Sequence, residues 1–363
     1  MFLAVKEIVM GQKIFFILII IGLPLSIAGS LLGWPSLLMF AVYCLTIIAL
    51  ASFMGRATES LAIIAGPRIG GLLNATFGNA VELIISIFSL KAGLIGIVLA
   101  SLTGSVIGNL LLVTGASFFL GGLKFKRQKF NVFDARHNAG LMTFGVLVAF
   151  IIPEVFAGEI DADKQMVLSA GISIILILLY IAALYFKLVT HRGVYSRQDE
   201  GQALIEEEEE PEWGKRRAII VLALATLAVA YVSENLVHTF EVVGEQLGWT
   251  ELFIGVIIVA IVGNAAEHAS AVIFAFKNKM DIAVEIAVGS TLQVAMFVAP
   301  VLVLVSFLFE EQMPLVFTLP ELVAMALSVL LMIVITNDGE SNWFEGLTLI
   351  AAYVLMGLGF YLI

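Results

Sequence analysis

The sequence is poor in charged residues. Only 13% of its 363 residues are Asp, Glu, Lys or Arg, whereas 61% are hydrophobic, and the mean hydropathy is +1.06. A soluble domain carries about a quarter charged residues, so the composition excludes an ordinary soluble protein and indicates a chain that lies in lipid. The net charge is −10, and no basic face with interleaved aromatics is present, so nucleic acid is not expected as a partner.

Cysteine is nearly absent. Cys44 stands alone within an apolar run, so it cannot form an intrachain disulfide and gives no metal-ligand spacing, and the redox compartment stays undetermined. The His-Glu-x-x-His and Gly-x-Ser-x-Gly motifs of hydrolases are also missing. An intramembrane hydrolase is therefore disfavoured, and the chain is not expected to be an enzyme.

Long apolar runs are what the sequence does contain. A helix needs about 20 apolar residues to cross the ~30 Å hydrocarbon core, and the sequence predicts an all-α integral membrane protein with about 11 transmembrane helices. The candidate spans are roughly 14–32, 36–54, 72–90, 93–121, 139–157, 166–189, 217–240, 252–275, 282–308, 318–336 and 344–363. The first run has an alternative reading as a signal peptide, because Lys6 and Lys13 precede it and Ala28 and Ser30 give it a small-x-small end.

The distribution of Lys and Arg predicts the orientation. With a cytoplasmic N-terminus and eleven crossings, all 19 basic residues fall in cytoplasmic segments except Lys91 and Lys164. Basic residues concentrate in short cytoplasmic loops, so the sequence predicts a multi-pass protein whose C-terminus lies outside. The short loops favour the cell (plasma) membrane over an organelle.

Two segments repeat each other. Gly78-Asn79-Ala80-Val81-Glu82 recurs as Gly263-Asn264-Ala265-Ala266-Glu267, and the same shift of 185 residues carries Gly104-Ser105 onto Gly289-Ser290. Five crossings separate the copies, and an odd number reverses their direction, so we expect two inverted five-helix repeats. Such repeats are typical of secondary transporters, which bind substrate near the midplane where the repeats meet.

The repeat divides the chain into four parts. We expect an extra N-terminal transmembrane helix over 1–34, a first repeat over 35–189, an acidic cytosolic linker over 190–215 and a second repeat over 216–363. The linker holds six glutamates: Glu206, Glu207, Glu208, Glu209, Glu210 and Glu212. It is either a solvated connector or a calcium-sensing, regulatory element.

Two carboxylates fall deep inside apolar runs. Glu82 and Glu267 lie within the third and eighth spans, where a charge costs roughly 2.5–3.5 kcal/mol on insertion scales, so such residues suggest a functional site. The alternative is a protonated Glu that hydrogen-bonds a neighbouring helix. Two glutamates at equivalent positions of a repeat favour the functional reading.

Each glutamate follows a weak point in its helix. Gly destabilises a helix interior by about 1 kcal/mol relative to Ala, and Asn79 and Asn264 offer their backbones competing hydrogen bonds. A break there would free backbone carbonyls, which we place near Ala80 and Ala265, and irregular backbone at this depth occurs only where it lines a cavity. For Gly104 and Gly289, close helix packing is an equally good explanation.

Hard oxygen ligands suit calcium. Ca2+ takes six to eight oxygens from carboxylates, carbonyls and water, and two glutamates balance its charge, whereas zinc or copper would require His or Cys. Without a cation the two anions would repel each other and lose solvation, which makes protons their natural replacement. This reasoning leaves calcium, sodium and manganese open.

Several other polar residues are weaker candidates. Ser105, Ser290, Asn109 and Gln293 could complete the cation site, although interhelical hydrogen bonding is their commoner role. His268 could orient Glu267 or share its proton, or simply pack in the core. Glu59 and Glu234, which we place near the cytosolic ends of their spans, could relay protons or be solvated there.

Together these motifs resemble the calcium/proton antiporters of the cation/proton exchanger family. Gly78 to Ile85 and Gly263 to His268 are similar to that family's two signature repeats, and Gly104-Ser105 and Gly289-Ser290 to the helices after them. The resemblance implies a ten-helix core plus one N-terminal helix, with calcium bound by Glu82 and Glu267 and protons driving the exchange. Related sodium/calcium exchangers carry a carboxylate near the position of Gln293 and Val294, and its absence here favours protons as the counter-ion.

The expected activity is therefore exchange of cytosolic Ca2+ for H+ by alternating access. The partners would be these two ions and the lipid bilayer, no cofactor is expected, and a homo-oligomer is compatible with the sequence. A sodium- or manganese-coupled exchanger and a passive cation channel remain alternatives, because a carboxylate pair at broken helices could also form a filter.

Overall fold

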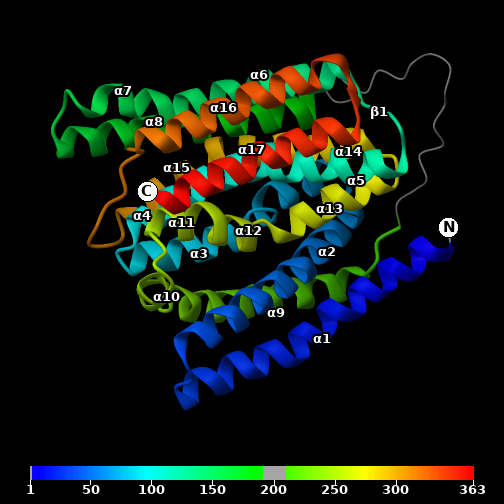
Figure 1. Cartoon of the computed structure of the whole chain (residues 1–363), viewed down its shortest axis with the longest axis horizontal. Coiled ribbons are helices and arrows are strands. Elements are labelled where there is room, and N and C mark those ends of the chain that lie inside the picture. Colours follow the sequence, from blue (N-terminus) through cyan, green and yellow to red (C-terminus); the bar gives the residue numbers. More distant parts are fainter. Residues whose placement is uncertain (1, 191–209) are drawn as a thin grey trace.

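The computed structural model describes residues 2–190 and 210–363, without the side chains of residues 2–12, 67–68, 75 and 133–134. Nearly all of this is helix, as the composition predicts. The N-terminal helix α1 (Phe2–Leu32) lies at the edge of the bundle beside α2 (Ser36–Phe77) (Figure 1), and much of its surface is exposed, as for a helix that faces lipid. The helix α2 bends at Gly66, whose φ of 78° lies in the left-handed region that favours glycine.

The remaining elements fall on the two sides of the linker. Before it lie α3 (Ala80–Lys91), α4 (Ile95–Ile107), η1 (Gly108–Val113), α5 (Thr114–Lys124), β1 (Gln128–Lys129), α6 (Val132–Val146), η2 (Leu147–Ile151), α7 (Ile152–Ala157), α8 (Ala162–Tyr185) and η3 (Phe186–Thr190). After it lie α9 (Lys215–Val237), α10 (Phe240–Leu247), α11 (Glu251–Phe253), η4 (Ile254–Val259), α12 (Ala260–Gly263), α13 (Ala265–Phe276), α14 (Met280–Gln293), η5 (Val294–Val298), α15 (Ala299–Ser306), α16 (Leu319–Ile335), η6 (Thr336–Asp338), β2 (Glu340–Ser341) and α17 (Trp343–Leu362).

Nine helices in the described ranges are long and apolar enough to cross a membrane. The other two expected spans, near 72–90 and 252–275, are each divided: one between α2 and α3 at Gly78-Asn79, the other between α12 and α13 at Asn264. The structure is thus compatible with eleven crossings if each divided segment counts as one. It also confirms the expectation that the helices break beside the repeated Gly-Asn pairs.

A second shared feature follows each repeat motif. The helix after Ser105 widens into the π-helical segment η1, and the helix after Ser290 widens into η5 at the corresponding position. Such π-bulges are rare and are often found at functional sites. The two repeats therefore share a π-helical segment as well as their sequence motifs.

Polar contacts join loops at the two ends of the bundle. At one end β1 pairs antiparallel with β2, Arg56 forms an ion pair with Glu212, and Lys187 forms one with Glu285. All of these segments were expected on the cytosolic side. The Lys91 ammonium instead pairs with Glu234, 2.9 Å away, at the far end of α3.

Candidate cation site

The two divided helices run in opposite directions past each other. In Figure 1 the chain passes from α2 to α3 in one direction and from α12 to α13 in the other, with α3 beside α12 and α13 beside α2. This is the arrangement of an inverted repeat. Each break therefore faces the break of the other repeat, and Glu82 and Glu267 begin the helices that leave the crossing.

Glycines make the close approach of the two repeats feasible. A Cβ on Gly263 would lie 3.3 Å from the Cβ of Glu82, and a Cβ on Gly78 would lie 3.2 Å from Oε1 of Glu267. Each glycine thus lies against the glutamate of the other repeat. The structure thereby brings the two predicted residues to the same helix crossing.

A serine holds each glutamate within its own repeat. The Ser105 hydroxyl donates to Oε1 of Glu82 at 2.6 Å, and the Ser290 hydroxyl donates to Oε2 of Glu267. The serines lie on α4 and α14, which return antiparallel to α3 and α13 after tight turns. Serine and glutamate are 23 residues apart in both repeats, and both pairs form the same kind of hydrogen bond.

The two asparagines connect the repeats to each other. The side-chain amide of Asn264 donates to Oγ of Ser105 at 2.9 Å, and the amide of Asn79 donates to Oε1 of Gln293. The structure thus brings Gln293 into hydrogen-bond contact with Asn79. Asn109 is also buried, but its side-chain amide nitrogen has no hydrogen-bond partner in the described residues, and the 185-residue shift carries it to Val294 rather than to Gln293.

Two buried oxygens in this cluster accept no hydrogen bond from the described residues. They are Oε2 of Glu82 and Oδ1 of Asn79, whose residues are 0% and 1% exposed. Unpaired buried oxygens are costly, and hard cations bind such groups. No group of three or more His, Cys, Asp or Glu side chains that could hold a metal ion occurs in the described ranges. The oxygens at the crossing are carboxylate and amide oxygens, which are of the kind that a hard cation binds.

The geometry changes which carbonyls are available to a cation. Ala80 and Ala265 are the first residues of α3 and α13, and a helix start leaves N–H groups unpaired, whereas carbonyls are left at a helix end. Unpaired carbonyls are therefore expected in the turns that end at Gly78 and Gly263, although the carbonyls of Asn74 and Ala260 already accept hydrogen bonds there. The N-terminal ends of α3 and α13 instead favour the negative charges of their glutamates.

The surroundings of Glu82 differ from those of its equivalent in the second repeat, Glu267. Glu82 is 0% exposed, whereas Glu267 is partly exposed. Before the first break Ile69 is 57% exposed, whereas its equivalent before the second break, Ile254, is 2% exposed. Among the described side chains, those on the side of α3 and η4 are thus more completely buried than those on the side of α13 and the last turns of α2.

Glu234, Glu59 and His268 were the candidates for proton transfer outside the glutamate pair. The prediction that Glu234 lies at the same end as Glu59 is wrong: Glu234 pairs with Lys91 at the opposite end, because α9 starts at Lys215 and has crossed the bundle by Glu234. Glu59 is exposed one turn after Arg56. The Nε2 atom of His268 is buried without a hydrogen-bond partner in the described residues.

Only part of the acidic linker is described. Glu206, Glu207, Glu208 and Glu209 lie outside the described residues, and Glu210 is exposed. Glu212 forms a two-pronged pair with Arg56, and the next residue, Trp213, is 5% exposed and packs against Phe53. The linker therefore ends on the first repeat before α9 begins.

Sequence reasoning missed one buried carboxylate. Glu321 is 3% exposed and accepts hydrogen bonds from the backbone and hydroxyl of Thr318 and from Thr103 on α4. The signal was present, because Thr318-x-x-Glu321 before an apolar run is a capping box. It stabilises the start of α16 and joins that helix to α4.

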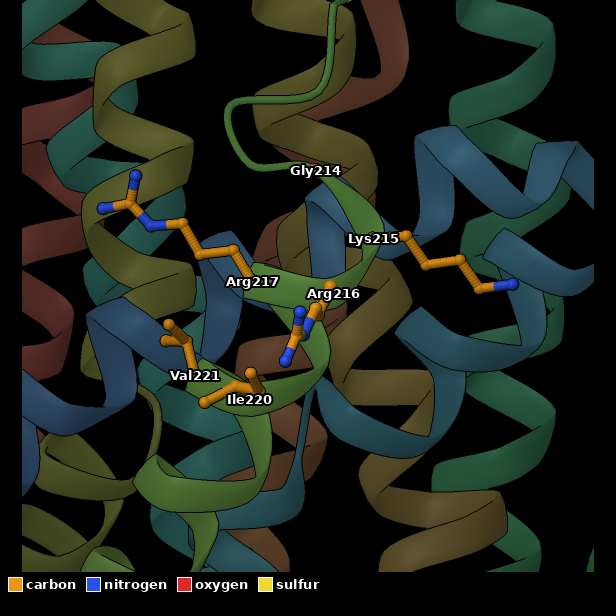
Figure 2. A pocket seen from close by; sticks show the side chains of 6 residues that line it. All are labelled: Gly214, Lys215, Arg216, Arg217, Ile220 and Val221. Atoms are coloured by element: carbon orange, nitrogen blue, oxygen red, sulfur yellow. The ribbon is translucent and has the colours of Figure 1, made fainter.

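Two surface pockets lie away from the helix crossing and are lined by basic side chains. One of about 570 Å3 lies at the start of α9 and is lined by Gly214, Lys215, Arg216, Arg217, Ile220 and Val221. Figure 2 shows the cationic side chains of Lys215, Arg216 and Arg217 spreading from this turn. A second, of about 520 Å3, contains Lys13, Arg56 and Arg217. Basic side chains line both hollows, and the second also contains Glu212, which pairs with Arg56.

The fold and the helix crossing define a class: a polytopic membrane protein whose two inverted halves each bring one carboxylate to the crossing. The chain belongs to the sodium/calcium exchanger protein family, whose sequence profile matches residues 35–189 and 217–362.

Similar proteins are found among both sequences and solved structures. The Ca(2+)/H(+) antiporter ChaA of Bacillus subtilis (strain 168) is 73% identical over 352 residues, which cover 97% of this chain and 100% of that protein. The structure of native YfkE superposes with a TM-score of 0.85 at 67% identity and covers 96% of this chain and 100% of that one. The H+/Ca2+ exchanger CAX superposes with a TM-score of 0.70 at 15% identity, covering 97% and 92%, which shows a common fold.

Proposed function

We propose that the chain exchanges cytosolic Ca2+ for H+ across the cell membrane, with Glu82 and Glu267 as a shared site for both ions. The observation that supports this most is the helix crossing, where each glutamate lies against the glycine of the other repeat. The similarity to ChaA, named as a Ca(2+)/H(+) antiporter, supports the choice of ions.

The residues at the crossing supply the ligands that calcium prefers. Glu82, Glu267 and Asn79 offer side-chain oxygens, and the turns before each break offer carbonyls. Six to eight such oxygens, some from water, complete the shell of Ca2+. The hydroxyls of Ser105 and Ser290 hold the carboxylates in place.

Competition between ions follows from charge. Two glutamates neutralise one Ca2+, but two unpaired carboxylates at this depth would repel each other in a medium that stabilises charge poorly. Protons remove that repulsion when calcium leaves. The site therefore holds either the divalent ion or protons, and this exclusion couples the two fluxes.

Transport then requires access from one side at a time. With the N-terminus in the cytoplasm, the less completely buried side, formed by α13 and the last turns of α2, faces the cytosol, and the more completely buried side faces outward. Calcium would enter beside the partly exposed Glu267. Rearrangement of the divided helices would open the outer side, where protons replace calcium.

Flux measurements test this proposal directly. Purified protein in liposomes that contain no sodium should take up calcium when a pH gradient, acidic inside, is imposed, and should move protons when a calcium gradient is imposed. Calcium movement that requires sodium would support a sodium-coupled exchanger instead. Calcium that only runs down its own gradient, whatever the proton gradient, would support a channel.

A further inference from the structure

The end of α13 and the turn that follows it are held by the other repeat. The side-chain amide of Gln128 donates to the carbonyl of Ala275 at 2.9 Å and to Oδ1 of Asn278 at 3.0 Å. The Lys124 ammonium donates to the carbonyl of Phe276 at 2.8 Å. Ala275 and Phe276 are the last residues of α13, where carbonyls lack their regular partner within the helix. Side chains of the first repeat therefore supply donors to the end of this helix.

Gln128 is closely fitted into this contact. It is 2% exposed and lies on β1, which follows α5. A Cβ on Gly121 of α5 would lie 2.2 Å from Oε1 of Gln128, so this glycine leaves the space that the amide occupies. The two amide hydrogens have two acceptors, and a buried donor that loses its acceptor is costly. The amide therefore fixes the turn to which it donates.

Asn278 has an unusual backbone conformation. Its φ of 60° lies in the left-handed region that favours glycine, and in the described ranges it is the one residue other than glycine with such a φ. The 185-residue shift carries Gly93 onto Asn278, and Gly93 has a φ of 76° in the equivalent turn between α3 and α4. Glycine is therefore sufficient for a turn of this shape. Asparagine tolerates the same region, and here its side chain also accepts the hydrogen bond from Gln128.

The equivalent contact at the turn between α3 and α4 is missing. The shift carries Lys124 to Phe309 and Gln128 to Met313, and neither of these side chains can donate a hydrogen bond. Gly93, at the position of the acceptor, has no side chain. The two donors and the acceptor are therefore present together at one turn and absent together at the other, as expected if they serve one purpose.

The contact lies at the far end of the helix that carries Glu267. This glutamate is in the first turn of α13 and Ala275 is near its end, about 12 Å further along the axis. A helix of about three turns moves as a unit, so a shift at its end displaces the carboxylate. Ca2+ binds oxygens at about 2.3–2.6 Å, and a site weakens when a ligand is misplaced by more than about 0.5 Å. The position of Glu267 relative to Glu82 therefore depends on what holds the end of α13.

We propose that Gln128 and Asn278 are positioning residues for the calcium site. With Lys124 they form a latch that holds the end of α13 and thereby keeps Glu267 opposite Glu82. This inference rests on the proposed function, because it requires that the two glutamates bind calcium together. The latch touches no ion. Its loss lets the end of α13 move and lowers the fraction of the protein that is ready to bind calcium, which raises the apparent dissociation constant by the same factor.

Substitutions of Asn278 separate positioning from folding. Asn278→Gly removes the acceptor but suits the positive φ, so the unfolding temperature in detergent should stay the same or rise. Calorimetric titration of the purified protein should nevertheless show about fivefold weaker calcium binding, which corresponds to one lost hydrogen bond of ~1 kcal/mol. In liposomes, the calcium concentration that half-saturates proton flux should rise by the same factor, with the maximal rate unchanged. Asn278→Asp keeps an oxygen that accepts from Gln128 and should bind calcium nearly as the wild type does.

Gly93→Asn is the matched control. It introduces asparagine at the equivalent turn, where the nearest atom to a Cβ is Oε2 of Glu311 at 3.8 Å. Met313 occupies the position equivalent to Gln128, so the new side chain has no amide donor there. This variant should change neither calcium affinity nor the half-saturating concentration.

The other outcomes are also decisive. Wild-type calcium affinity in Asn278→Gly would overturn the inference, whatever its unfolding temperature. Equal weakening by Asn278→Gly and Asn278→Asp would overturn it too, because the hydrogen bond from Gln128 would not be the cause. Absence of proton-coupled flux in the wild type would refute the proposed exchange, while the calcium titration would still decide whether the latch positions the glutamates.

Discussion

The hairpins α3–α4 and α13–α14 carry the same chemical groups in different surroundings. Each has a glutamate at the start of its first helix and a serine that donates to it. Yet Gly104 is pressed against the second repeat, where a Cβ would lie 2.1 Å from the carbonyl oxygen of Val256, whereas a Cβ on its equivalent Gly289 would meet nothing within 4 Å. The repeats are alike in sequence but unequally packed.

This difference teaches how a symmetric pair can serve a directional process. If both hairpins were packed as tightly as α3–α4, the site would be closed on both sides; if both were as loose as α13–α14, ions would leak. One tight and one loose contact correspond to a single open side. If the contact of α3–α4 loosened and that of α13–α14 tightened, the opposite side of the site would open. The proposed mechanism requires this change.

The largest expected effect comes from making the two glutamates permanently neutral. Glu82→Gln and Glu267→Gln keep the side-chain size but cannot lose or gain the proton, so each should abolish calcium-driven proton flux in liposomes. The exposed Glu310, outside the site, provides the control Glu310→Gln, which should transport normally. Near-normal exchange in either glutamine variant would show that this glutamate is not part of the site. The two hairpins would then not be functionally equivalent.

The equivalent glycines should respond in opposite ways. Gly104→Ala forces a methyl group against backbone and should destabilise the protein by about 1–3 kcal/mol, whereas Gly289→Ala meets open space and removes a helix-interior glycine at a gain of up to ~1 kcal/mol. Thermal unfolding in detergent measures both. Gly289→Ala should nevertheless slow exchange, because the opposite state needs the close contact there.

Two results would contradict this comparison of the glycines. Equal destabilisation by both substitutions would mean that the two hairpins are packed alike in the membrane protein. Undiminished exchange by Gly289→Ala would mean that its hairpin never takes up the tight arrangement of α3–α4.

Loss of the serine hydroxyls should weaken calcium binding unequally. Ser105→Ala removes the donor to Glu82 and also the acceptor of Asn264 from the other repeat, whereas Ser290→Ala removes only the donor to Glu267. A hydrogen bond to a charged group contributes about 1.5–3 kcal/mol, so Ser105→Ala should lower calcium affinity by about tenfold or more, and Ser290→Ala by less. Calorimetric titration of purified protein measures this order, and the reverse order would show that the contact between repeats is unimportant.

The smallest effect is expected where the linker meets the first repeat. Glu212→Gln breaks the pair with Arg56, but both side chains are partly exposed, and such pairs contribute at most about 1 kcal/mol. Unfolding temperature and exchange should therefore change little. A large loss of exchange would show that this end of the linker controls the repeats. Deletion of residues 204–211, which spares the ion pair, would then test whether the acidic segment acts through it.

Much of this site could be predicted from sequence because its signals are local. The paired Gly-Asn-Ala-x-Glu motifs predicted the breaks, and apolar length predicted the spans. Glu234 was assigned to the wrong end of the bundle. It lies near the end of α9 (Lys215–Val237), after the chain has crossed to the other side. Asn109 was grouped with Gln293 on similar chemistry, although the register of the repeat assigns them to non-equivalent positions.

The sequence alone determined that the chain lies in a membrane, that it contains two related halves and that each half carries one carboxylate within an apolar run. Only the tertiary structure decided which side of the site is more completely buried, which glycine is pressed against a neighbour and which turn the other repeat holds. The physical reason is that composition and periodicity act within one helix. Burial and hydrogen bonding at the crossing depend also on residues 159 and 214 positions apart, whose contact exists only once the two halves pack against each other.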